Sequence, residues 1–157
     1  MDAFAQFLDY LIRNLSEKCP TLTDPRNIII GESQSLLDLG RDEFPRAEIL
    51  ITKLKCDGFI DQRSIEQSFR FSIGGFIKRI DHKVTPDDMF AALRFGREML
   101  KVVMESHEDR IRGDFPCEGF QQINGYPEVF YEYEIFDKIT GVILNAEAQV
   151  TLPDTYI

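Results

Sequence analysis

The feature that most constrains the fold is a long alternation of apolar and polar residues between Ser64 and Ile80. The apolar members of its first half share odd positions: Ile65, Phe69, Phe71 and Ile73. A period of two over this length predicts one long β-strand with an apolar face. A shorter alternation over residues 47–52 precedes it, and the turn signal CDGFIDQ separates the two. The sequence therefore predicts a long β-hairpin.

Two adjacent glycines, Gly74 and Gly75, interrupt this long strand. The apolar phase slips by one residue across them, because Phe76 and Ile80 occupy even positions. A β-bulge inserts one residue and turns the following side chains over, so we predict a bulge at Gly74 and Gly75. A phosphate-binding loop needs its glycines where a strand meets a helix, whereas more strand follows here. We therefore assign the glycine pair a structural role.

Two segments have the spacing of amphipathic helices. The N-terminal one has apolar residues three and four positions apart: Phe4, Phe7, Leu8, Leu11, Ile12 and Leu15. The central one begins at Thr85, a predicted N-cap that forms a capping box with Asp88, and continues with Pro86. Its apolar stripe contains Met89, Ala92, Leu93, Gly96, Met99, Leu100 and Val103. A glycine inside a helix is unfavourable, so Gly96 indicates a close backbone approach.

A second hairpin is predicted near the C-terminus, where alternating segments over 129–136 and 142–152 flank the turn DKITG. A short buried strand ends at Gly31, the segment from Ser33 to Pro45 reads as irregular, and residues 110–127 read as a loop. No internal repeat or linker divides the chain. Residues 1–157 are thus predicted to form a single α+β domain with a mainly antiparallel, twisted sheet, packed by an N-terminal and a central helix.

Composition excludes several classes of function. The net charge of −9 argues against a protein that binds nucleic acid by neutralising phosphates, although an acidic wall lets a duplex slide past. No apolar run reaches the length of about 20 residues that spans a bilayer. The N-terminus lacks the basic start of a signal peptide, so we expect a protein made in the cytosol. Cys19, Cys56 and Cys117 are too far apart for a metal motif and are expected to be reduced thiols.

No set of residues in the sequence has the types and spacing of a known catalytic site. His82 and His107 lack the spacing of zinc ligands. The stretch GESQS lacks the last glycine of a nucleophile elbow. Glu132 and Glu134 share a strand face, but a second carboxylate-bearing wall is missing, so a solvated or channel-lining acidic strip is the better interpretation. We expect a protein that is not an enzyme and holds no cofactor.

The only basic cluster in the acidic chain contains Lys78, Arg79, His82 and Lys83. One interpretation is a solvated strand end. The other is an electrostatic contact with an acidic neighbour, such as another copy of the chain. Interface charges resemble ordinary surface charges, and the sequence leaves both interpretations open.

The order of these elements, with the stretch FPRAEILITK and the terminal stretch EVFYEYEIFDKITGVILNAEAQVTLP, resembles the tail terminator (tail completion) proteins of long-tailed bacteriophages. The resemblance extends from about Asp2 to Pro153. It implies a ring of six subunits that caps the tail tube, stops its growth and meets the neck of the head, while DNA passes through the centre without sequence-specific binding. The implied partners are further copies of the chain, the tube protein, the neck or head-completion protein and, in a contractile tail, the sheath protein.

The resemblance also suggests roles for individual residues. Arg70, Lys78, Arg79 and Lys83 are expected at contacts with neighbouring subunits or the tube. Charge reversal at Lys78 and Arg79 is expected to impair assembly while the monomer stays folded. An acidic strip is expected to face the lumen: Glu132, Glu134 and Glu147. The protein is then expected at the head-proximal end of the tail in the virion, and in the host cytoplasm during assembly. The alternatives are another phage neck, head-completion or tube protein, or a small cytosolic enzyme or ligand-binding domain.

Overall fold

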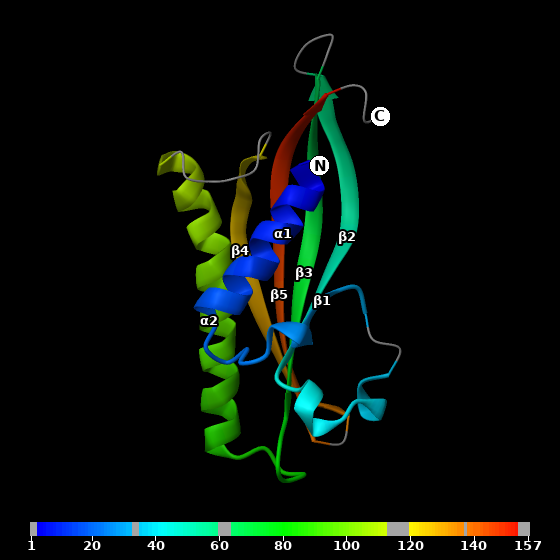
Figure 1. Ribbon diagram of the computed structural model, residues 1–157, viewed down its shortest axis with the longest axis vertical. Helices are drawn as coiled ribbons and strands as arrows, with labels where there is room; N and C mark the ends of the chain where they lie inside the picture. The colour runs from blue at the N-terminus through cyan, green and yellow to red at the C-terminus, as the bar shows by residue number, and fades with distance from the viewer. Residues whose placement is uncertain (1–2, 33–34, 60–63, 113–119, 137, 154–157) are drawn as a thin grey trace.

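A five-stranded sheet with helices on one face forms the fold in the computed structural model (Figure 1). The structure describes residues 3–32, 35–59, 64–112, 120–136 and 138–153. Within them, the two α-helices are α1 (Ala3–Lys18) and α2 (Pro86–Arg112). The strands are β1 (Ile28–Ile30), β2 (Arg46–Phe59), β3 (Ser64–Lys78), β4 (Phe120–Phe136) and β5 (Ile139–Pro153). The predicted α+β class is confirmed.

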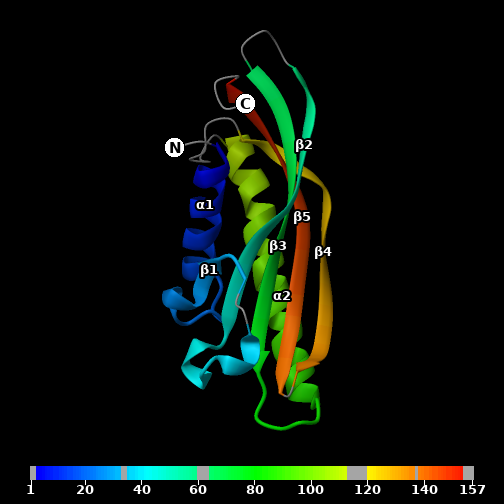
Figure 2. The same ribbon diagram turned by 90° about the vertical axis from the view of Figure 1, so that its right-hand side faces the viewer.

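The strand order is β1-β2-β3-β5-β4, and every neighbouring pair except β1 and β2 is antiparallel. Both predicted hairpins are present, as β2–β3 and β4–β5. Both helices lie on the same side of the twisted sheet (Figure 1 and Figure 2). No helix in the described part of the chain is both long and apolar enough to cross a membrane.

The predicted bulge at Gly74 and Gly75 is wrong. The pairing of β3 with β5 keeps one register from Ser64–Pro153 to Lys78–Ile139, straight through both glycines. The register shifts of the β2–β3 hairpin lie elsewhere, between Ile51 and Lys53 and between Cys56 and Gly58. The glycines instead leave room for neighbouring rings. A Cβ atom on Gly75 would lie 2.7 Å from Cε2 of the buried Phe95 in α2.

The apolar phase slips at Phe76 because a second, smaller cluster buries it on the face of the sheet opposite the helices. Its buried members are Leu36, Phe44, Phe76 and Ile139. The segment predicted as irregular contributes two of them, through short 3-10 turns at Leu36–Asp38 and Arg41–Glu43. Ile80, the other residue of the shifted phase, is not part of this cluster and is 76% exposed.

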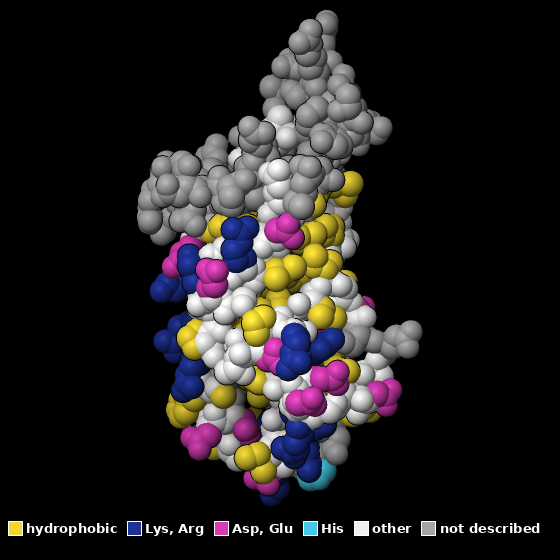
Figure 3. Space-filling model, in the orientation of Figure 1, with side chains coloured by type: hydrophobic (Ala, Val, Ile, Leu, Met, Phe, Trp, Pro, Cys, Tyr) yellow, Lys and Arg dark blue, Asp and Glu magenta, His cyan; other side chains and the backbone are white. Residues whose placement is uncertain are grey.

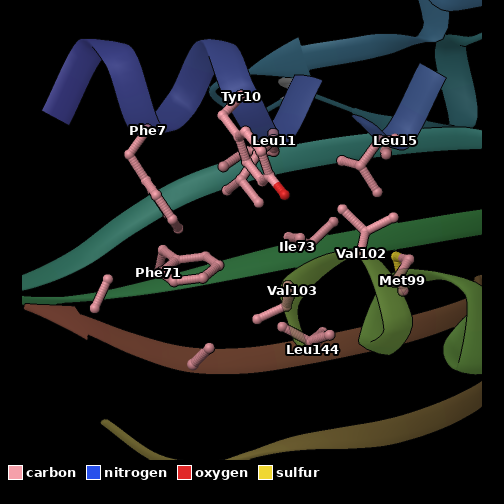
Figure 4. Close-up of a cluster of buried hydrophobic side chains, with 14 of the residues drawn as sticks. Phe7, Tyr10, Leu11, Leu15, Phe71, Ile73, Met99, Val102, Val103 and Leu144 are labelled. Carbon is pink, nitrogen blue, oxygen red and sulfur yellow. The ribbon is translucent and has the colours of Figure 1, made fainter. Parts of the chain in front are cut away.

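The main core lies between the helices and the sheet (Figure 4). The predicted face of α1 is confirmed, with Phe7, Leu11 and Leu15 fully buried. The rings of Phe7 and Phe71 meet edge to face with centroids 5.3 Å apart. The stripe of α2 is confirmed in part: Met99 is buried, whereas Met89 is 45% exposed. Burial of such large side chains stabilises the fold by about 1.5–3 kcal/mol for each.

The start and the middle of α2 have the predicted features. The Thr85 amide donates to the Asp88 carboxylate at 2.8 Å, and the Asp88 amide donates to the Thr85 hydroxyl at 3.3 Å. This capping box satisfies amides that the first turn leaves without partners. At Gly96 an added Cβ would collide with the Tyr131 hydroxyl, so the predicted close approach is confirmed.

The loop predicted over residues 110–127 is too long. Helix α2 continues to Arg112, β4 begins at Phe120, and residues 113–119 lie outside the described part of the chain. Strand β4 has register shifts between Asn124 and Glu128 and between Glu132 and Phe136. Such irregularities disguise the strand in the sequence, because they break its period of two.

Substitution of Gly75 by valine tests the tight contact between β3 and α2. The added side chain has to displace the Phe95 ring, and such overpacking lowers the free energy of unfolding by about 1–3 kcal/mol. Urea denaturation measures this loss. Phe95→Leu in the same chain should make the Gly75→Val substitution less costly than it is alone, because the ring that it meets is gone. A Gly75→Val protein as stable as the wild type contradicts the contact.

Candidate interaction surfaces

The distal half of β2, residues 51–57, forms an exposed strand that we call the arm, whereas the β3 residues paired with it include the buried Phe69 and Phe71. In Figure 1 the hairpin continues past the N-terminal end of α1. Every residue of β2 from 51 to 57 is exposed, including the apolar Ile51 and Leu54 at 44% and 57%. Strand β1 pairs with β2 only over Ala47–Ile49, so the outer edge of β2 beyond Ile49 has no strand partner among the described residues. Figure 3 shows apolar side chains on this side of the molecule.

The arm has two features that limit non-specific pairing of its free edge with strands of other molecules. Its two register shifts disturb the free edge, and Lys53 and Lys55 place charges on it. Lysines and bulges are the usual protection of an edge strand against aggregation. An edge with exposed apolar residues and such protection suits a specific partner strand or surface.

The structure divides the predicted basic cluster. Lys83 and His82 are exposed, and Lys78 is half-buried with its ammonium 5.7 Å from the centroid of the Phe44 ring. Arg79 is only 3% exposed, so it is not available for an intermolecular contact. The placement of Arg79 on an interaction surface is therefore wrong.

Arg79 holds one end of the sheet together. Its guanidinium donates to the Tyr133 carbonyl, to the Thr140 hydroxyl at 2.9 Å and to the His82 carbonyl at 3.0 Å. Its backbone amide donates to the Lys138 carbonyl at 2.6 Å. These bonds connect the end of β3 to β4, to β5 and to the loop before α2. A basic residue at a strand end has the sequence signature of a surface charge, which explains the incorrect placement.

Arg70 is exposed, as an interface residue has to be, and lies on the sheet face opposite the helices. Its Nε lies 3.8 Å from the Glu147 carboxylate on the paired strand β5. Glu147 also shares a small hollow with Lys53 and Lys55. It is therefore surrounded by cations, and the structure does not bring it together with Glu132 and Glu134.

Glu132 and Glu134 are exposed on β4, as predicted, but they do not form a purely acidic strip. Phe130 and Phe136 on the same strand are 50% and 47% exposed. Three residues of β4 pair with alternate residues of β5 and so share the face opposite the helices: Glu128, Phe130 and Glu132. We call these three residues the β4 row.

A basic stripe on α2 was not predicted from the sequence. Its members are exposed and recur at helical spacing: Phe90, Arg94, Arg97 and Lys101. We call these four residues the α2 ridge. At 100° for each residue, the ridge lies opposite the buried Ala92, Phe95 and Met99 and points away from the sheet. The signal was present in the sequence, but a charged stripe is usually a solvated helix face.

A hollow of about 460 Å³ lies beside the β4 row, where the register of β4 shifts. Its polar lining includes Arg70, Asn124, Glu128 and Glu147. Among the described residues, no histidine, cysteine or serine lines it, and no three His, Cys, Asp or Glu side chains form a group that could hold a metal ion. The lining offers hydrogen bonds and charge to a partner surface.

The thiol of Cys19 is buried beside the Glu98 carboxylate, to which it donates at 3.2 Å. Burial raises the pKa of Cys19 strongly, and the hydrogen bond and the negative charge of Glu98 raise it further. Glu98 also accepts from the Thr21 amide at 3.1 Å. The thiol therefore stays protonated and holds the end of α1 against α2, whereas Cys56 is exposed.

Comparison with known proteins adds no family assignment: no protein-family model matches the chain, and no curated protein matches it at a significant level.

Replacement of Arg79 by methionine should destabilise the monomer. It removes the guanidinium from three acceptors and leaves them partly unsatisfied, which lowers the free energy of unfolding by about 2–4 kcal/mol. Lys78→Met is the matched control, because among the described residues Lys78 makes only a distant ring contact, and it should leave stability nearly unchanged. Urea denaturation of both variants measures this difference in stability. Equal midpoints for the two variants contradict the structural role of Arg79.

The two described cysteines should differ sharply in reactivity. In a Cys117→Ser background at mildly alkaline pH, Cys56 should react at once with a thiol reagent, and Cys19 only as the protein unfolds. Because the pKa of Cys19 is higher in the folded protein than in the unfolded one, the thiol ionises at a lower pH in the unfolded protein. Stability should therefore fall as pH rises above about 8.5, and Cys19→Ala should reduce this fall. Two rapidly reacting thiols in the native protein contradict this assignment.

Proposed function

We propose that this chain is a structural virion protein that forms a ring of six subunits on the tail tube of a long-tailed bacteriophage. The ring ends tube elongation and provides the interface to the neck. The exposed arm is the observation that carries the proposal. A subunit that works alone gains nothing from a long strand edge with solvent-exposed Ile51 and Leu54. A subunit that docks on a neighbour uses both the edge and the apolar side chains.

The charge distribution supports the same function. A net charge of −9 suits a ring through which DNA passes, because an acidic wall repels the duplex. The exposed cations Arg70 and Lys83 and the half-buried Lys78 are proposed for contacts with neighbouring subunits or the tube. Arg79 is excluded from these contacts by its burial.

The proposed partners are further copies of this chain, the tube protein and the neck or head-completion protein, together with the sheath protein in a contractile tail. The site of action is the head-proximal end of the tail, with assembly in the host cytoplasm. The arm equally suits a neck or tube subunit, so the end of the tube that the protein binds distinguishes these alternatives.

The purified chain should form rings with an open centre. Native mass spectrometry over a concentration series should show six copies, and negative-stain images of the same sample should show the central opening. Added to assembled tail tubes, the rings should cap one end and stop elongation. Particles without an opening, or subunits that join along the tube, contradict the terminator function.

The arm can be tested with matched variants. Leu54→Asp should abolish the rings while the monomer stays folded, because it places a charge on the exposed apolar arm. Leu37→Asp is the control, since Leu37 is exposed to a similar degree, 53% against 57%, but lies outside the arm. Circular dichroism verifies the fold of both. Intact rings with Leu54→Asp remove the observation on which the proposal depends.

A further inference from the structure

The α2 ridge and the β4 row have opposite charge and similar chemistry. Each combines one half-exposed phenylalanine with charged neighbours: Phe90 is 62% exposed and Phe130 is 50% exposed. Arg94 and Arg97 form no ion pair with a carboxylate among the described residues, and Glu128 and Glu132 form none with a cation there, whereas Lys101 of the ridge pairs with Glu105 at 3.8 Å. Both surfaces therefore hold charges that the described part of the chain leaves unneutralised.

The two surfaces also match in length. Arg94 to Lys101 spans about 10 Å along the helix at 1.5 Å for each residue. Glu128 to Glu132 spans about 13 Å along the strand at 3.3 Å for each residue. Two or three cations of the ridge can thus lie opposite the two carboxylates of the row, with the aromatic rings beside them.

We infer that the α2 ridge of one copy docks on the β4 row of the next copy, and that this contact joins neighbouring subunits. The inference rests on the proposed ring and names the surfaces that close it. A second copy is the occupant because the chain itself supplies both complementary surfaces. Basic stripes facing acidic rows fix the register of an interface and exclude wrong partners.

The positions of the two surfaces favour a head-to-tail contact. The ridge points away from the sheet on the helix side, and the row lies on the opposite face of the sheet. A flat two-fold dimer cannot use both surfaces at once, because they face in opposite directions. A head-to-tail contact uses both in every copy and closes into a ring when the rotation permits. Glu132 then lies at the boundary between subunits and not in the lumen.

A charge-swap experiment tests the contact. One variant carries Arg94→Glu with Arg97→Glu, and the other carries Glu128→Lys with Glu132→Lys. All four positions are exposed, so both variants should fold. Each variant alone should assemble at least about 100-fold more weakly than the wild type, because like charges then face each other in every contact.

A mixture of the two variants should assemble again. The acidic ridge of the first fits the basic row of the second, and the acidic row of the first fits the basic ridge of the second. Native mass spectrometry should therefore show particles with equal numbers of the two variants. Arg13→Glu with Arg41→Glu is the control: it changes the net charge as much as the ridge variant does, both residues are exposed outside the arm, the ridge and the row, and it should leave assembly unchanged.

The outcomes separate this inference from the proposed function. Rings that survive both reversals, or reversed variants that stay apart when mixed, overturn the contact between ridge and row while the ring remains. Wild-type protein that stays monomeric at every concentration also overturns the contact. Rescue in the mixture without an open ring, or without binding to a tube end, supports the contact and contradicts the terminator function.

Discussion

The uninterrupted pairing of β3 with β5 is the constraint on which the rest of the structure depends. It runs in one register from Ser64–Pro153 to Lys78–Ile139, and it fixes which side chains face the helices and which face away. Because the register admits no extra residue, α2 can approach only where β3 lacks a side chain, at Gly75. The same register keeps β3 between β2 and β5, so the exposed strand, the arm, is the distal half of β2.

Much of the fold could be predicted because its signals are local. Periods of two and 3.6, together with the capping box at Thr85, predicted both helices and both hairpins. The bulge was wrong because burial of Phe76 depends on a segment far away in the sequence, which places Phe44 on the other face of the sheet. The start of β4 was missed because its register shifts remove the periodic signal.

The candidate surfaces could be predicted less well, because charge alone does not distinguish burial from exposure. Arg79 lies buried among carbonyl groups, and Glu147 lies among cations, although both resemble free surface charges in the sequence. The α2 ridge was not predicted, because a charged stripe on a helix is usually a solvated face and its sequence gives no sign of the β4 row on the opposite face of the sheet. The exposed Arg94 and Arg97 thus lie on the helix side of the chain, and Glu128 and Glu132 lie on the opposite face of the sheet. Each copy therefore has a basic surface, the α2 ridge, and an acidic surface, the β4 row, that face in opposite directions.

The most direct measurement is zero-length cross-linking of amines to carboxylates in particles assembled from isotope-labelled and unlabelled copies. The mixture separates bonds between copies from bonds within one copy. We expect Lys101 of one copy to be joined to Glu128 or Glu132 of another, because head-to-tail docking places them together. Cross-links between copies that leave out both the ridge and the row would contradict a ring built from these two surfaces.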